Sequence, residues 1–257
     1  MTQPSVDLGS WIRRYHQAPE STVRLVCFPH AGGSANFYFP VSAKLSPTVE
    51  VRAVQYPGRQ DRRKEANIGD IHELADAAFE AVRTLADMPL AFFGHSMGAV
   101  VAYEVALRLE QAGVAPLTRL FVSGRRAPSR YRSDRVHERD DQGVVAELRR
   151  LSGTGTDLLG DPETLEMILP AVRNDYRAIE TYRHAPGRTV NCPVSVLIGD
   201  SDPQVTTAEA DAWSEHTTGS FDLRVFPGGH FYLAERSAEV ITAVSNDLAT
   251  VGSHAGP

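Results

Sequence analysis

The chain contains six short apolar runs, each followed within three residues by a glycine or a proline. Most of the runs are largely apolar rather than alternating, although 49–55 and 221–226 include charged residues, and such runs are typical of parallel strands whose two faces are both covered. Helical patterns separate most of the runs, so we expect an α/β fold with a mostly parallel, doubly wound sheet and right-handed crossovers. The runs cover residues 23–28, 49–55, 90–93, 120–123, 194–198 and 221–226.

Between the fourth and fifth runs lies a long segment without a strand pattern. Residues 71–85 and 240–248 carry apolar side chains at helical spacing beside the sheet. Within the long segment the clearest pattern is another helix, over residues 165–179, which Pro170 is expected to kink or split. We interpret this helical insertion as a lid, and extra helices packed on the sheet edge are the alternative.

Composition and charge narrow the class of protein. With 26 basic and 32 acidic residues, the formal net charge is −6, which argues against a nucleic-acid-binding protein. The length and an apolar share of 42% suit one domain, residues 1–257, with a substantial core. Cys27 and Cys192 lie in or beside apolar runs and are expected to be reduced and buried. No membrane span or secretory signal is visible, so we expect a cytoplasmic protein with no membrane partner.

One junction between a predicted strand and a predicted helix carries the pattern of a catalytic nucleophile. The segment Gly94-His95-Ser96-Met97-Gly98 matches G-x-S-x-G and has these two elements on its flanks. In that context the serine sits on a tight turn, and the two glycines avoid a collision between strand and helix. The positive end of the helix favours developing negative charge. We therefore predict Ser96 as the nucleophile, and a glycine-rich turn with a capping serine is the alternative.

A nucleophilic serine needs a general base that a carboxylate orients. The strand predicted at 194–198 is followed by Asp200 and Asp202, and the strand predicted at 221–226 is followed by His230. Because the carboxyl ends of neighbouring parallel strands meet at one edge of the sheet, we predict His230 as the base. We favour Asp202 as the acid because it lies further from its strand, and we expect Asp200 to stabilise a turn.

The other histidines are expected to have other roles. His30 and His95 neighbour the site but precede glycine-rich turns, which favours structural roles for both. His184 lies near the end of the insertion. Five more lie in polar surroundings and are expected to be exposed to solvent: His16, His72, His137, His216 and His254.

Acyl transfer also needs N–H donors that stabilise an oxyanion. One donor is expected to be the backbone N–H of Met97, the residue after the nucleophile, and the other the N–H of Ala31 in the glycine-rich loop 29–33. A plain Gly-Gly turn is the alternative for that loop. We see no zinc-ligand spacing, no phosphate-binding loop and no dinucleotide fingerprint, so neither a metal nor a cofactor is implied.

Together these segments resemble the type II thioesterases that accompany polyketide and nonribosomal peptide synthetases. The resemblance implies an α/β-hydrolase fold, a triad of Ser96, Asp202 and His230, and a helical lid over residues 126–188. It also implies hydrolysis of acyl groups from the phosphopantetheine arm of an acyl or peptidyl carrier protein, which clears stalled or mis-primed units. The matching segments are Phe28-Pro29-His30-Ala31-Gly32-Gly33, Tyr56-Pro57-Gly58-Arg59, Gly94-His95-Ser96-Met97-Gly98, Gly199-Asp200-Ser201-Asp202-Pro203 and Gly228-Gly229-His230-Phe231.

Alternatives remain for the partner and the reaction. A general carboxylic-ester hydrolase or an acyltransferase would use the same three residues, and a non-catalytic binding protein on this fold is the alternative outside enzymes. A basic stretch in the insertion is a candidate contact for an acidic carrier protein or the pantetheine phosphate, with a solvated lid base as the alternative. Its members are Arg125, Arg126, Arg130, Arg132 and Arg135.

Overall fold

A computed structural model describes residues 8–114, 116–152 and 161–252 of the chain. Its centre is one sheet of seven strands: β1 (Ile12–Arg13), β2 (Arg24–Phe28), β3 (Glu50–Val54), β4 (Leu90–His95), β5 (Leu117–Ser123), β6 (Val194–Gly199) and β7 (Phe221–Phe226). The strand order is β1-β3-β2-β4-β5-β6-β7. All neighbouring strands are parallel except β1, which runs antiparallel to β3.

The predicted parallel sheet is confirmed, and each of the six apolar runs forms a strand. Successive residues of β2 alternate between two apolar clusters, Val26 on one face of the sheet and Leu25 and Cys27 on the other. Both faces are therefore buried, which is the physical reason for an unbroken apolar run. Cys27 and Cys192 are buried free thiols, as predicted. The sequence missed β1, because two residues are too few to show a pattern.

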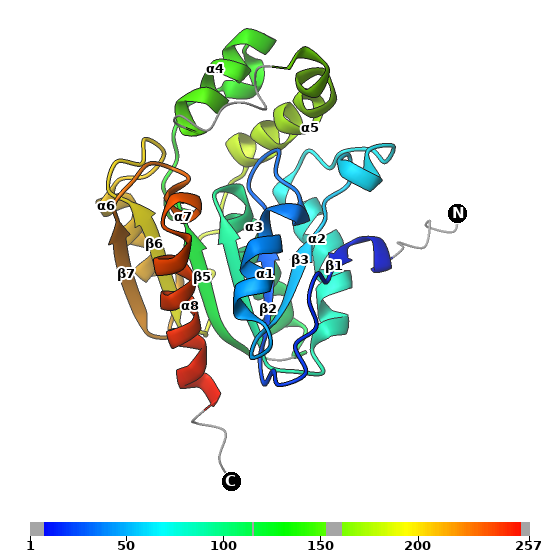
Figure 1. Ribbon diagram of the computed structural model, residues 1–257. Coiled ribbons are helices and arrows are strands. Elements are labelled where there is room, and N and C mark those ends of the chain that lie inside the picture. Colours follow the sequence, from blue (N-terminus) through cyan, green and yellow to red (C-terminus); the bar gives the residue numbers. More distant parts are fainter. Residues whose placement is uncertain (1–7, 115, 153–160, 253–257) are drawn as a thin grey trace.

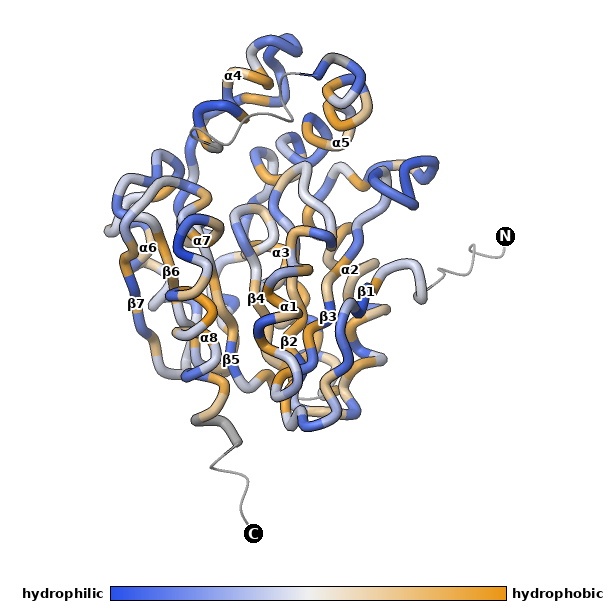
Figure 2. The backbone as a smooth tube through the Cα atoms, in the orientation of Figure 1, coloured by the Kyte–Doolittle hydropathy of each residue, from blue (hydrophilic) through white to orange (hydrophobic). Residues whose placement is uncertain are grey.

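Helices cover both faces of the sheet (Figure 1). On one face lie α2 (Ile71–Val82) and α3 (Met97–Gln111), and on the other lie α1 (Phe39–Leu45) and α8 (Ser237–Gly252). The short helices α6 (Thr207–Asp211) and α7 (Tyr232–Glu235) follow β6 and β7. Figure 2 shows apolar residues concentrated along the central strands and polar residues in the loop that follows β3. Among the described helices, none is both long and apolar enough to cross a bilayer.

The connection between β5 and β6 contains two helices, α4 (Asp141–Ser152) and α5 (Pro162–Thr181). Both lie above the edge of the sheet at which the parallel strands end (Figure 1). Residues 153–160 of this connection lie outside the described residues. The helix predicted over 165–179 is confirmed. Of the two effects expected at Pro170, a kink or a split, the split is wrong, because α5 runs through this residue. Pro170 and Glu166 are exposed, so water can hydrate the carbonyl that the proline leaves without a partner.

Candidate active site

Ser96 occupies a strained turn between β4 and α3. Its backbone angles, φ 55° and ψ −119°, lie in a region that residues with a Cβ rarely adopt. A Cβ at Gly94 would lie 2.3 Å from the carbonyl oxygen of Gly98, and a Cβ at Gly98 would lie 2.0 Å from that of Phe28. The steric need for both glycines is therefore confirmed. The turn places Ser96 at the N-terminus of α3, where the first N–H groups of a helix have no partner within it.

His230 and Asp202 form a buried pair at the ends of β7 and β6. Nδ1 of His230 lies 2.9 Å from Oδ2 and 3.0 Å from Oδ1 of Asp202. The Asp202 side chain is fully buried and that of His230 is 2% exposed. Oδ1 of Asp202 also accepts the backbone N–H of Gln204, at 2.8 Å. The carboxylate is thus held in place while it faces the imidazole, which is the arrangement that orients a general base.

Asp200, the other candidate acid, is engaged elsewhere. Its Oδ1 accepts the N–H of Gly228 and the hydroxyl of Ser201, both at 3.0 Å. These hydrogen bonds lower the pKa of the Asp200 carboxyl. The side chain therefore ties the loop after β6 to the loop after β7, in line with the turn role expected for it.

The end of β5 lies between the serine and the histidine. The N–H of Ser96 donates to the carbonyl of Ser123 at 2.8 Å. A Cβ at Gly124, whose φ is +59°, would lie 3.4 Å from Cε1 of His230. Among the described residues the Ser96 hydroxyl makes no hydrogen bond. Contacts between a nucleophile and its base are often long in unliganded enzymes and tighten only when substrate is bound.

His95 lies behind the catalytic candidates and is fully buried. Its Nδ1 is 3.0 Å from Oγ of Ser123, which in turn is 2.8 Å from the hydroxyl of Tyr232. Its ring centroid lies 4.9 Å from that of His230. Burial, and then the neighbouring His230, lowers the pKa of His95, so the ring is neutral. These contacts agree with the structural role expected for His95.

The loop predicted to supply an oxyanion donor, residues 29–33, makes a tight turn at the end of β2. The N–H of Gly33 donates to the carbonyl of His30 at 2.9 Å, and Gly32 has φ +73°. Among the described residues, the Ala31 N–H has no hydrogen-bond acceptor, which leaves it available to a ligand. Ala31 also packs against an apolar cluster from the β5–β6 connection: Val136, Val144, Val172 and Tyr176.

Most of the basic stretch is paired within the chain. Arg125 differs, because its Nε is buried without a hydrogen-bond partner among the described residues. Burial, and then the nearby Arg126, lowers the pKa of Arg125 to about 9. Internal pairing favours a structural base of the insertion over a free docking surface for the other four arginines. Their ion pairs are Arg126–Asp134, Arg130–Glu215, Arg132–Glu209 and Arg135–Glu138.

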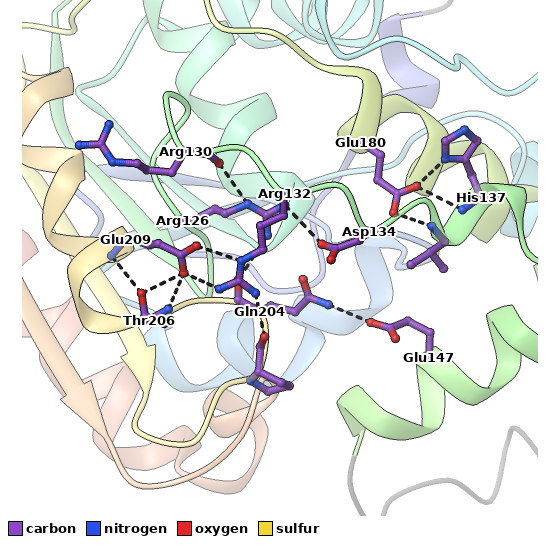
Figure 3. Close-up of polar contacts among 12 residues, drawn as sticks. Arg126, Arg130, Arg132, Asp134, His137, Glu147, Glu180, Gln204, Thr206 and Glu209 are labelled. Atoms are coloured by element: carbon purple, nitrogen blue, oxygen red, sulfur yellow. Dashed lines mark hydrogen bonds and ion pairs between the residues drawn. The ribbon is translucent and has the colours of Figure 1, made fainter.

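The insertion also contacts the loop that carries Asp202 (Figure 3). Nε2 of Gln204 donates to Oε1 of Glu147 on α4, at 2.9 Å. Arg132 donates to the carbonyl of Pro203 at 3.0 Å, and Arg126 donates to that of Gln204 at 3.3 Å. The residues just after Asp202 are therefore held by side chains from the insertion.

The sequence interpretation was wrong about one histidine and gave no role to an ion pair. His216 is 3% exposed rather than solvent-exposed, and its Nε2 lies 2.9 Å from Oγ of Ser129. His254 lies outside the described residues.

Arg59 and Asp175 form a buried ion pair beside the loop 29–33. The burial of Asp175 could have been predicted, because residues three positions apart lie on the same helix face and the apolar Val172 is three positions before it. Among the described residues, no cluster of histidine, cysteine or acidic side chains could hold a metal ion.

Comparison with known proteins shows which family the chain belongs to. A family model described as "Thioesterase domain" matches residues 23–248. The chain is 56% identical over 238 residues to a "Probable cadicidin biosynthesis thioesterase" of Streptomyces griseus, covering 93% of this chain and 66% of that protein. It is 51% identical over 246 residues to "Thioesterase PikA5" of Streptomyces venezuelae, covering 95% of this chain and 87% of that protein.

Among solved structures, the type II thioesterase BorB from the borrelidin biosynthetic cluster matches with a TM-score of 0.88. The two chains are 52% identical, and the match covers 93% of this chain and 98% of BorB. The predicted α/β-hydrolase fold and the resemblance noted from the sequence motifs are thereby confirmed. Since the family model spans most of the chain, this protein belongs to the thioesterase family.

Proposed function

We propose that this protein is a serine hydrolase that releases acyl groups from the phosphopantetheine arm of an acyl or peptidyl carrier protein. In this role it would edit the products of a polyketide or nonribosomal peptide synthetase in the cytoplasm. The observation that carries the proposal is the buried His230–Asp202 pair at the sheet edge that also holds the strained Ser96 turn. The biosynthetic clusters named for the relatives support the choice of substrate.

The mechanism proceeds through an acyl-enzyme. His230 removes the hydroxyl proton of Ser96 while Oγ attacks the thioester carbonyl, and the protonated ring then gives that proton to the departing pantetheine thiol. Water activated by His230 attacks the acyl-Ser96 ester, which releases the free acid and restores the serine. Asp202 keeps the imidazole oriented and stabilises its positive form.

The oxyanion of each tetrahedral intermediate is stabilised by the backbone N–H groups of Met97 and Ala31. Met97 is the first residue of α3, so its N–H has no acceptor within the helix. Removing one such donor typically costs ~3 kcal/mol of transition-state stabilisation. We assign residues 126–188 as the lid, whose described helices α4 and α5 lie over this edge of the sheet, and the apolar cluster beside Ala31 supplies a surface for the acyl chain.

The assignment of the nucleophile is tested with a fluorophosphonate probe. We expect the wild-type protein to be labelled and the Ser96→Ala variant to remain unlabelled. Labelling that persists in Ser96→Ala would falsify the role of this serine. The reaction class is tested by comparing kcat/KM on an acyl-carrier thioester and on a simple aryl ester, with product masses recorded. A higher value on the aryl ester, or a transfer product in place of the free acid, contradicts the proposed substrate or reaction.

The two aspartates provide a matched pair of variants for the acid. Asp202→Asn is expected to lower kcat by about 10⁴-fold, because the amide favours the wrong imidazole tautomer. Asp200→Asn, an exposed position two residues away, is expected to change kcat by less than about threefold, because its contacts are to backbone and Ser201. Equal effects of the two substitutions would exclude Asp202 as the specific partner of His230.

A further inference from the structure

A buried ion pair joins the insertion to the body of the fold. Asp175 lies on α5 and its side chain is 1% exposed, while Arg59 lies in the loop after β3 and its side chain is 7% exposed. Nη1 of Arg59 is 2.6 Å from Oδ2 of Asp175, and Nη2 is 3.0 Å from Oδ1. Such a bidentate pair fixes the orientation of both groups as well as their distance.

Both members of this pair also hold the loop 29–33. Oδ2 of Asp175 accepts the backbone N–H of Gly32 at 2.8 Å, and Nη1 of Arg59 donates to the carbonyl of Gly33 at 3.1 Å. A Cβ at Gly32 would lie only 2.5 Å from Cγ2 of Val172, so α5 approaches this backbone closely. The loop is therefore fixed by charged groups as well as by apolar contact.

These contacts determine the direction of the Ala31 N–H. A peptide unit is planar, so the Gly32 N–H bonded to Asp175 fixes the plane between Ala31 and Gly32. The bond from the Gly33 N–H to the His30 carbonyl fixes the preceding plane, in which the Ala31 N–H points opposite to that carbonyl. If Asp175 moved, the plane between Ala31 and Gly32 would lose its anchor, and the Gly33–His30 hydrogen bond alone would hold the Ala31 N–H.

We infer that Asp175, together with Arg59, is a positioning residue that sets the geometry of the oxyanion donor at Ala31 from the lid helix α5. The inference rests on the proposed function, in which Ala31 donates to the oxyanion. The ion pair acts on the transition state through the loop and does not touch the substrate. It therefore affects kcat more than KM, because an oxyanion donor binds the transition state more strongly than the ground state.

The test separates the stability of the pair from its effect on the loop. Asp175→Asn keeps an oxygen for the Gly32 N–H but leaves Arg59 without a counter-ion, which is strongly destabilising. The double variant Arg59→Met/Asp175→Leu removes both charges, which is often neutral for stability, but it also removes the acceptor for Gly32. Melting temperature, kcat and KM for release of an acyl group from a carrier protein are measured for each variant well below its melting temperature.

We expect the variant with the lower melting temperature to keep the higher kcat. Asp175→Asn should have the lower melting temperature but keep more of its kcat. The double variant should melt near the wild type, with kcat at least tenfold lower and KM within about twofold. A double variant with kcat within twofold of the wild type, or a kcat that follows melting temperature across the variants, would overturn the inference.

A control on the same helix is Glu180, whose carboxylate accepts the N–H groups of Val136 and His137 within the insertion. Glu180→Gln is expected to leave kcat within twofold of the wild type even if it melts earlier. A tenfold loss in Glu180→Gln would show that any damage to α5 lowers kcat, which would also overturn the inference. The fluorophosphonate test of Ser96 in the wild type is independent of these variants, so a failure of the proposed function is recognised separately.

Discussion

His30 allows a quantitative prediction about how burial sets protonation beside the site. Its ring meets Phe37 and Phe231 edge-on, with centroids 4.8 and 4.9 Å away, and its buried Nδ1 has no partner among the described residues. Burial, and then the nearby His230 and Arg59, lowers the pKa of His30 from 6.5 to about 3. The ring is therefore neutral in the folded chain above that pH.

The unfolded chain takes up a proton at His30 as the pH falls below 6.5, whereas the folded chain does so only near pH 3. The free energy of unfolding therefore decreases as the pH drops below 6.5, because the unfolded state binds the additional proton. One pKa unit corresponds to about 1.4 kcal/mol, so this residue alone removes about 2 kcal/mol by about pH 5.

The substitution His30→Phe removes the titrating group and keeps a ring against Phe37 and Phe231. Its overpacking cost of about 1–3 kcal/mol is independent of pH, and all other titrating groups are shared with the wild type. Urea unfolding between about pH 8 and about pH 5, followed by tryptophan fluorescence, gives the two free energies. We expect the variant to gain about 2 kcal/mol relative to the wild type over this range. A difference that stays constant within about 0.5 kcal/mol would refute the reasoning.

Three further predictions concern packing and charge. Gly98→Ala should lower the free energy of unfolding by at least about 3 kcal/mol, because the new Cβ meets the backbone of Phe28, and an unchanged urea midpoint would contradict this. Glu104 is fully buried and paired, so Glu104→Leu should cost about 3–5 kcal/mol by urea unfolding; a cost under about 1 kcal/mol would speak against it. The double reversal Arg130→Glu/Arg135→Glu should change KM for an acyl-carrier protein by less than about threefold, since both arginines are paired internally. A larger rise, with KM for acyl-pantetheine unchanged, would instead support a docking role for these arginines.

The strands of the sheet were predictable because each carries its own local signal. The six longer strands appear as runs rich in apolar residues, and their observed ends differ from the predicted ends by a few residues at most. The exceptions were features without a local signal. The strand β1 has only two residues, and the continuity of α5 through Pro170 depends on the exposure of that turn to water.

In the candidate site, too, some features were predictable from the sequence and others only from the fold. The strained turn at Ser96 follows from five consecutive residues between a strand and a helix, so the sequence was sufficient to locate it. The choice between Asp200 and Asp202 could be argued from position along the chain, but only the folded loops show which carboxylate meets His230. Asp175 was invisible as a partner, since nothing near it in the chain points to Arg59.

The amino-acid order thus specifies the parallel sheet, the turn that carries the serine and the two loops that approach it. Backbone conformation and apolar periodicity depend on neighbours within a few residues, so they can be read along the chain. The fold alone decides that α5 lies against the loop 29–33 and that a buried carboxylate holds the Gly32 N–H. Contacts of this kind join residues that are 143 positions apart, and their geometry is set by the packing of whole elements rather than by any local pattern.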